Sequence, residues 1–145
     1  DFDEIVAVTA YDEIEDYCLR KGIKTVINKN SQLGQSQSIK LGTKALYDMD
    51  AIAYFVCAQP FLSCDSILKL KNNVQEDRIV VPVCEGNSYS PCIFNKKYFD
   101  LLLTLEGDKG GKSIIKNNTD YVNYVYFTDK KEFFDIDNLD DLISL

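Results

Sequence analysis

The chain of 145 residues contains no histidine. Histidine is the most frequent general acid–base and metal-binding side chain near neutral pH, so its absence excludes Ser-His-Asp and Cys-His catalysis and nearly all catalytic zinc sites. The five cysteines include no C-x-x-C pair. We expect free thiols in a reducing compartment, with a disulfide or a cysteine-only metal site as the alternative. The lack of histidine narrows the possible chemistry more than any other feature of the composition.

The chain also lacks a long apolar run. No stretch approaches the ~18 residues that a membrane span needs, and the acidic residues 1–4 (DFDE) do not resemble a signal peptide. The net charge of −7 disfavours nucleic-acid polymers and anionic membranes as partners. It allows a nucleotide, because magnesium can neutralise phosphates beside carboxylates. We therefore expect a cytoplasmic protein with neither nucleic-acid nor membrane partners.

Helical and extended patterns alternate along the chain. Strands are expected at 5–9, 24–28, 52–57, 78–84, 91–94 and 122–127, and helices at 11–21, 35–47, 61–73, 96–105, 113–117 and 138–145. Local signals support these bounds: Gly22 is a natural helix stop, Ser63 a helix cap, and Pro82 indicates an edge strand or an irregularity. The alternation is typical of an α/β protein, a three-layer αβα sandwich with a mostly parallel sheet. We expect a single domain over residues 1–145.

The most apolar segment covers residues 51–60 (AIAYFVCAQP). A continuous apolar run that ends in a polar turn is typical of a buried parallel strand. In open α/β sheets, ligands bind at the carboxyl ends of strands. Ala58 and Gln59 therefore occupy the expected ligand position, although the methyl group of Ala58 cannot coordinate a cation.

Two glycine-containing segments can bind polar or anionic groups. The first follows Asn28 and covers residues 34–38 (GQSQS). There a glycine allows close backbone approach, and the hydroxyls of Ser36 and Ser38 lie at the start of a helix. The alternative is a simple helix cap at Ser36. The second covers residues 107–112 (GDKGGK), in which the glycines suit a backbone nest for phosphate. Its alternative is a flexible turn between helices.

The C-terminal segment 135–142 (DIDNLDDL) places several carboxylates just before a predicted helix. Capping by Asn138 or Asp140, together with solvated charge, is the ordinary explanation for the neighbours of Asp137.

In this order and spacing, the segments resemble the nucleotidyltransferases that activate molybdopterin, the cytidylyltransferase and guanylyltransferase branch of the nucleotide-sugar transferase fold. The resemblance runs from Ile5 to the C-terminus. It implies a Rossmann-like nucleotide-diphospho-sugar transferase fold, with Mg²⁺ and with CTP or GTP as substrate. It implies a second substrate of the molybdopterin type, whose phosphate attacks the α-phosphorus and releases pyrophosphate. The site residues that it implies are Ser36, Ser38, Gln59, Asp108 and Lys112 for ligand binding and Asp137 for the metal.

The chain departs from this family at several positions. The family's apolar strand ends in Asp-Gln-Pro, so Ala58 replaces one metal carboxylate. Lys112 stands where arginine is frequent, and Tyr89-Ser90-Pro91 stands where relatives often have Gly-His-Pro. The family's first strand and its glycine-rich phosphate loop would have to precede Asp1, so the first βα unit is missing from residues 1–145. The chain also starts without methionine, and we expect it to be part of a longer polypeptide.

These departures lead to two expectations. The chain by itself should have weak activity or none, and no catalytic residue is assigned. Because the missing strand is central in the fold, the chain should self-associate as a homo-oligomer through the exposed sheet gap, or accept a compensating element from another chain.

Two alternatives remain open, because fold alone does not decide function. One is a non-catalytic molybdopterin- or nucleotide-binding domain, and the other is a sugar-phosphate nucleotidyltransferase. A glycine-rich segment with arginine and lysine upstream of Asp1 would favour an enzyme.

Overall fold

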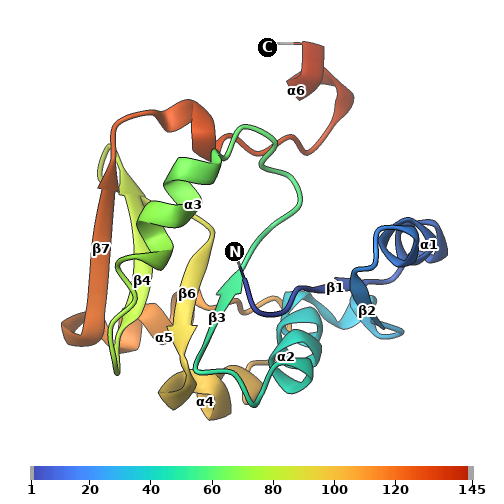
Figure 1. Ribbon diagram of the computed structural model, residues 1–145, viewed down its shortest axis with the longest axis horizontal. Coiled ribbons are helices and arrows are strands. Elements are labelled where there is room, and N and C mark those ends of the chain that lie inside the picture. Colours follow the sequence, from blue (N-terminus) through green and yellow to red (C-terminus); the bar gives the residue numbers. More distant parts are fainter. Residues whose placement is uncertain (1, 144–145) are drawn as a thin grey trace. The chain divides into compact units, whose positions relative to one another are not determined.

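The computed structural model describes residues 2–143 and divides into two compact units (Figure 1). The first unit comprises the residues up to Ile52 together with Lys96–Thr119. The second comprises Ala53–Asn95 together with the residues from Asp120 onward. Both helices and strands occur in each unit, so the α/β class predicted from the alternating pattern is confirmed.

The first unit begins with a parallel βαβ element. Strand β1 (Val6–Thr9) pairs in parallel with β2 (Lys24–Ile27), and α1 (Asp12–Arg20) connects them. Gly22 has φ +70°, and the N–H of Ile23 donates to the carbonyl oxygen of Cys18 at 2.9 Å. A glycine in the left-handed region allows this closing bond at a helix end, which confirms the predicted stop.

The rest of the first unit is helical. A short 3-10 turn (Ser31–Leu33) leads into α2 (Gln35–Ala45), which packs against β1 and α4 (Phe99–Leu103). The rings of Tyr47 and Phe99 lie 5.9 Å apart between centroids. A 3-10 turn (Lys96–Tyr98) precedes α4, and α5 (Lys112–Asn117) follows it. The apolar interior of this part is formed by buried Tyr98, Phe99, Leu102, Leu105 and Ile114.

The second unit is built around a sheet with the strand order β3-β6-β4-β5 and with β7 on β4. Its strands are β3 (Ala51–Tyr54), whose first two residues belong to the first unit, β4 (Ile79–Cys84), β5 (Asn87–Ser88), β6 (Cys92–Asn95) and β7 (Val122–Phe127). All six residues of β4 are buried. Helix α3 (Cys64–Lys71) packs on β4, and α6 (Leu139–Ile143) is the last described helix.

The larger sheet is mixed in direction, whereas a mostly parallel sheet was expected. Strand β4 is parallel to β7 but antiparallel to β5 and β6. The connections from β4 to β5 and β6 are short, and a parallel crossover needs about a dozen residues or more. Short connections therefore impose the antiparallel direction.

Two details of the strands differ from the sequence-based expectation. Pro82 lies in β4, which is flanked by β6 and β7, so an edge position is wrong and the irregularity is right. The paired positions of β4 with β6 end at Val80 and those with β5 begin at Val83, so Pro82 falls in the break between them. A residue without an N–H is tolerated at such a break. Strand β3 ends at Tyr54, before the expected end at 57.

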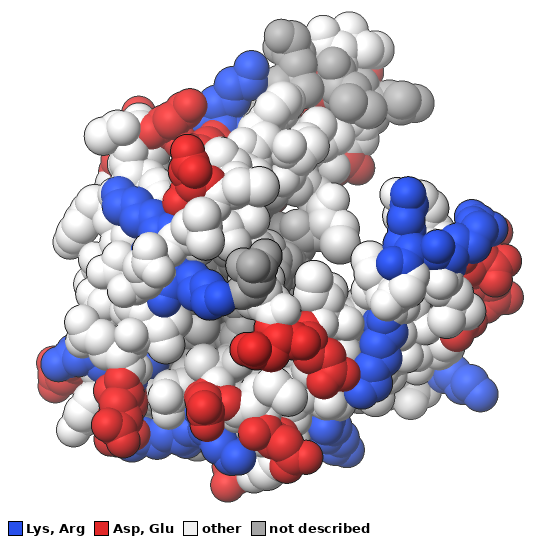
Figure 2. Space-filling model, in the orientation of Figure 1, with Lys and Arg blue, Asp and Glu red and all other residues white. Residues whose placement is uncertain are grey.

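Surface properties agree with the composition. On the face drawn in Figure 2, Lys and Arg side chains are interspersed with Asp and Glu side chains. Between residues 2 and 143, no helix is both long and apolar enough to cross a membrane.

Candidate functional site

The segment at Gly34 lies directly against the loop that begins at Gly107, and both belong to the first unit. Gly34 has φ 100° and ψ 174°, a conformation that is essentially restricted to glycine. A Cβ at this position would lie 2.4 Å from the carbonyl carbon of Gly107 and 2.6 Å from Oδ1 of Asp108. The N–H of Ser36 donates to the carbonyl oxygen of Gly107 at 3.1 Å. The structure therefore brings two of the sequence-predicted segments together.

Ser36 and Ser38 hold this arrangement from the start of α2. Gly34 is the N-cap, so the simple helix cap considered for Ser36 is wrong. Ser36 is the second helical residue and is fully buried. The hydroxyl of Ser38 accepts from Nδ2 of Asn28 at 2.9 Å. Both serines thus make internal contacts, and their direct role toward a ligand stays a prediction.

Asn28 anchors the turn that precedes this segment. Its side chain is only 2% exposed, and its Oδ1 accepts from the N–H of Asn30 at 3.0 Å. This is the side-chain-to-backbone bond of an Asx turn, which Asn forms two residues along the chain. An asparagine directly after a strand was the sequence signal for this anchor.

The loop 107–112 leads into α5. Gly107 has φ +58°, and the N–H of Lys109 donates to the carbonyl oxygen of Glu106 at 3.2 Å. Asp108 and Lys112 are exposed on this loop, and Lys112 is the first residue of α5. The ammonium group of Lys112 can attract a phosphate and the carboxylate of Asp108 can accept hydrogen bonds from a polar ring, and these ligand roles stay predictions.

The turn after β3 contains Ala58 and Gln59 and belongs to the second unit. The carbonyl oxygen of Ala58 accepts from the N–H of Ile136 at 2.8 Å, which brings the turn beside the segment that carries Asp137. Within the described part of the chain, Oε1 of Gln59 is buried and accepts no hydrogen bond. An unpaired buried acceptor costs about 1–3 kcal/mol unless a donor reaches it, so this atom is suited to a ligand or water donor.

Asp137 lies just before α6, and its carboxylate is exposed. Oδ2 of Asp141 accepts from the N–H groups of Asp137 and Asn138 at 2.9 and 3.0 Å. In return, Oδ1 of Asn138 accepts from the N–H groups of Asp140 and Asp141 at 2.9 and 3.1 Å. This reciprocal pattern is a capping box, so the capping role is right for Asn138, with Asp141 as its partner. Asp137 joins it only through its backbone.

The resemblance implies a divalent cation, and the described residues can bind one only together with a nucleotide. Among residues 2–143, no group of three or more His, Cys, Asp or Glu could hold a metal. The segment whose Ile136 bonds to Ala58 carries two exposed acidic residues, Asp135 and Asp137, of which the resemblance implies Asp137. Mg²⁺ is commonly held by one or two carboxylates together with substrate phosphates and waters. The site therefore fits a cation that arrives with a nucleotide rather than one in a protein cage.

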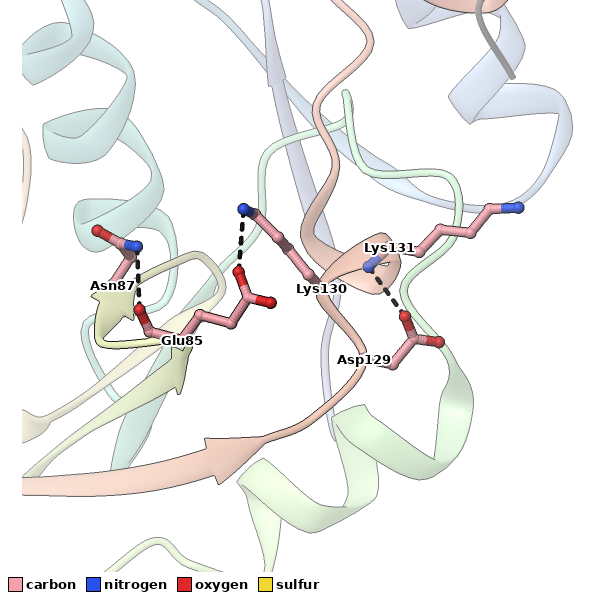
Figure 3. A network of polar contacts seen from close by, with 5 residues as sticks. All are labelled: Glu85, Asn87, Asp129, Lys130 and Lys131. Carbon is pink, nitrogen blue, oxygen red and sulfur yellow. Dashed lines mark hydrogen bonds and ion pairs between the residues drawn. The ribbon is translucent and has the colours of Figure 1, made fainter.

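Aromatic and charged side chains gather where β4 and β7 end, and sequence reasoning missed this grouping. The rings of Tyr89 and Phe133 stack with centroids 5.0 Å apart. Lys130 and Glu85 form an exposed ion pair of 3.0 Å, and the N–H of Lys131 donates to Oδ1 of Asp129 at 2.9 Å (Figure 3). The bond to Glu85 raises the pKa of Lys130. The pairs Tyr89–Phe133 and Glu85–Lys130 are remote in sequence, so spacing gave no signal for them.

We compared the chain with curated proteins, solved structures and protein families. No curated protein matches the chain. Solved structures do, among them Rv0371c in complex with manganese from Mycobacterium tuberculosis H37Rv (TM-score 0.83, 17% identity, 99% of this chain and 77% of that one). The 4-diphosphocytidyl-2C-methyl-D-erythritol synthase of Anaerococcus prevotii matches with a TM-score of 0.76 and 20% identity over 99% of this chain and 77% of its own.

The third structure to note is molybdopterin-guanine dinucleotide biosynthesis protein A of Archaeoglobus fulgidus. Its TM-score is 0.57 at 17% identity, over 96% of this chain and 75% of that one. These likenesses show that the fold is of the nucleotidyltransferase type. Residues 1–122 match the family described as MobA-like NTP transferase domain. The chain therefore belongs to the MobA-like NTP transferase domain family.

Proposed function

We propose that the chain forms the ligand-binding part of a nucleotidyltransferase that moves CMP or GMP from CTP or GTP to the phosphate of a molybdopterin-type acceptor, with Mg²⁺ bound beside the triphosphate. The family membership supports a nucleotide substrate. The observation that carries the proposal is the 2.8 Å bond between Ala58 and Ile136, which joins the turn after β3 to the Asp137 segment. This is where a strand-end ligand would meet a metal carboxylate.

We assign a proposed role to each candidate site residue within its own unit. In the first unit, Ser36 and Ser38 shape the wall for the nucleotide, and exposed Asp108 and Lys112 contact the acceptor. In the second unit, Gln59 receives a hydrogen bond from the ligand and Asp137 binds the cation that accompanies the phosphates.

The transfer itself needs little covalent help from the protein. An acceptor phosphate oxygen attacks the α-phosphorus, the bond to the β-phosphate oxygen breaks, and pyrophosphate leaves. Positioning of the two reactants and stabilisation of the developing charge supply most of the acceleration. Because Ala58 offers no carboxylate, we expect residues 1–145 by themselves to bind nucleotide better than they turn it over.

That same alanine favours a second function, a non-catalytic nucleotide- or molybdopterin-binding domain. A third, cytidylyl transfer to a sugar phosphate, is supported by the similarity to the synthase of Anaerococcus prevotii. Pyrophosphate release separates the first function from the second, and the identity of the acceptor separates it from the third.

The test is calorimetric titration of CTP, GTP and ATP into the full-length protein, each with and without Mg²⁺. We expect CTP or GTP to bind at least about tenfold more tightly than ATP, a difference of about 1.4 kcal/mol, and only with Mg²⁺. Pyrophosphate release on adding molybdopterin would then establish transfer. If no nucleotide binds with Mg²⁺, the proposal is wrong.

We also propose a homo-oligomeric partner. Within the described residues, β1 pairs with β2 only, so its other edge carries backbone groups that another strand can pair.

A further inference from the structure

We propose that Glu132 is a positioning residue that fixes the turn after β3 to the segment before α6, and thereby sets where Gln59 and Asp137 stand. All the residues involved belong to the second unit. The consequence for nucleotide binding rests on the proposed function, whereas the positioning itself does not.

Glu132 lies in a short 3-10 turn, η4 (Lys130–Phe133), and caps a helix that is distant in sequence. Its Oε2 accepts from the N–H of Ser63 at 2.9 Å, across a separation of 69 residues. Ser63 is the N-cap of α3, and its own hydroxyl accepts from the N–H of Ser66 at 3.1 Å. The predicted cap at Ser63 is therefore confirmed. The N–H of Ser63 itself is a second donor at the start of this helix, and Glu132 accepts from it.

Together these two bonds form a capping box in which the second acceptor, Glu132, comes from outside the helix. In an ordinary box, a Glu or Gln at the third helical position reaches back to the N–H of the cap residue. In α3 this third position is Ser66, a shorter side chain. The carboxylate of Glu132 supplies the missing acceptor instead, and a hydrogen bond joins it to Ser66 as well. The start of α3 thus depends on η4.

Two neighbouring contacts extend this link to the candidate site. The Nζ of Lys131 lies 4.8 Å from the centroid of the Phe61 ring. The N–H of Ile136 donates to the carbonyl oxygen of Ala58. Residues 131, 132 and 136 therefore contact residues 61, 63 and 58, and Gln59 and Asp137 lie between or beside these contacts. Glu132 makes the charge-assisted hydrogen bond, which is the strong kind.

The charge state of Glu132 agrees with this role. Burial alone would raise the pKa of its carboxyl group, but hydrogen bonds from Ser66 and Ser63 and the charge of Lys69 outweigh burial and lower it. The ionised form, which accepts these bonds, is therefore the one present near neutral pH.

The experiment compares Glu132→Ala and Glu132→Gln with Glu85→Gln, a matched control whose carboxylate makes an exposed ion pair nearby (Figure 3). Amide hydrogen exchange is measured first, without ligand. In Glu132→Ala we expect the amide of Ser63 to exchange about tenfold faster or more, the factor for loss of a charged hydrogen bond. The amide of Ile136, whose bond to Ala58 depends on where Glu132 holds the turn, should also exchange faster. The amides of Val80 and Val81 in β4 should be unchanged, and Glu132→Gln should restore part of the protection.

Titration of CTP with Mg²⁺ follows in the full-length protein, where we expect about tenfold weaker binding for Glu132→Ala (about 1.4 kcal/mol) and none of this loss for Glu85→Gln. An unchanged Ile136 amide overturns the positioning role. Uniform acceleration of all amides also overturns it, since that is a purely structural effect. If the exchange pattern appears but the unaltered protein binds no nucleotide, the proposed function fails and the positioning role stands.

Discussion

At the scale of single residues, Gly34 is tightly constrained by its backbone conformation and by the loop packed against it. Its backbone conformation excludes other residues, and the space where a Cβ would stand is already filled by the backbone of Gly107. Backbone cannot move aside as a flexible side chain can. The positive φ and the close packing together explain why glycine stands here.

This leads to a stability prediction. Gly34→Ala should destabilise the fold by more than about 3 kcal/mol, because strain and a backbone clash add. Gly107→Ala is the control: its φ is also positive, but no atom lies within 4 Å of the added Cβ. The cost there should be only about 1–2 kcal/mol, that of the left-handed conformation. Urea unfolding of both variants measures the difference, and equal losses would contradict the close packing at Gly34.

A second residue-scale prediction concerns the cation. Ala58→Asp, in the full-length protein, should strengthen Mg²⁺-dependent binding of CTP or GTP, because a second carboxylate would stand beside Asp137. Asp137→Asn should weaken that binding with little loss of stability, since only its backbone N–H takes part in the α6 cap. Calorimetry with and without Mg²⁺ measures the first effect and urea unfolding the second.

Either variant can show that the assignment is wrong. If Ala58→Asp leaves the affinity unchanged, position 58 does not face the cation. A large loss of stability in Asp137→Asn would mean that Asp137 is structural.

At the scale of elements, the sequence predicted helix ends correctly where they depend on hydrogen bonds between nearby residues. Ser63 and Gly22 mark a helix start and a helix stop through bonds within a few residues, and the structure has both. Pro82 and the end of β3 depend on which strand lies alongside. The sequence could not show that β4 lies between other strands of the sheet. It also could not show that β3, which pairs with the four-residue strand β6, ends at Tyr54.

In the candidate site, too, some residues could be predicted from the sequence and others, which depend on contacts remote in sequence, could not. Resemblance to a family identified Gln59 and Asp137, and the structure connects their segments through Ala58 and Ile136. The contact of Ser36 with Gly107 could not be foreseen, because that loop lies about seventy residues further along the chain. Glu132 was missed for the same reason: its partner, the start of α3, is remote in sequence.

The cap that Glu132 gives α3 predicts a pH dependence. Because the pKa of Glu132 is lowered on folding from its usual 4.5, its ionised form stabilises the native state above that value. The contribution is lost as the pH falls through the lowered folded-state pKa, where the carboxylate is protonated. Urea midpoints of the unaltered protein and Glu132→Gln should therefore differ at neutral pH and converge in acid. A difference that stays constant would contradict the cap.

At the scale of the whole molecule, the edge of β1 that pairs with no other described strand is the feature with the largest consequence. Three of its four residues (VAVT) are β-branched, none is charged, and it contains no proline or lysine to prevent pairing. Edges of this kind are templates for another strand. Ile5, just before β1, is 57% exposed, so an apolar side chain also lies at the start of the edge.

We therefore predict concentration-dependent self-association of residues 1–145, measured by light scattering. Ile5→Lys should reduce it, because a charge beside an edge strand opposes pairing. Leu19→Lys in α1 is the matched control, since Leu19 is equally exposed, at 58%, but lies outside the strand. A monodisperse monomer at every concentration would show that the edge does not pair. Equal effects of the two lysines would show that association depends on general hydrophobicity rather than on the β1 edge.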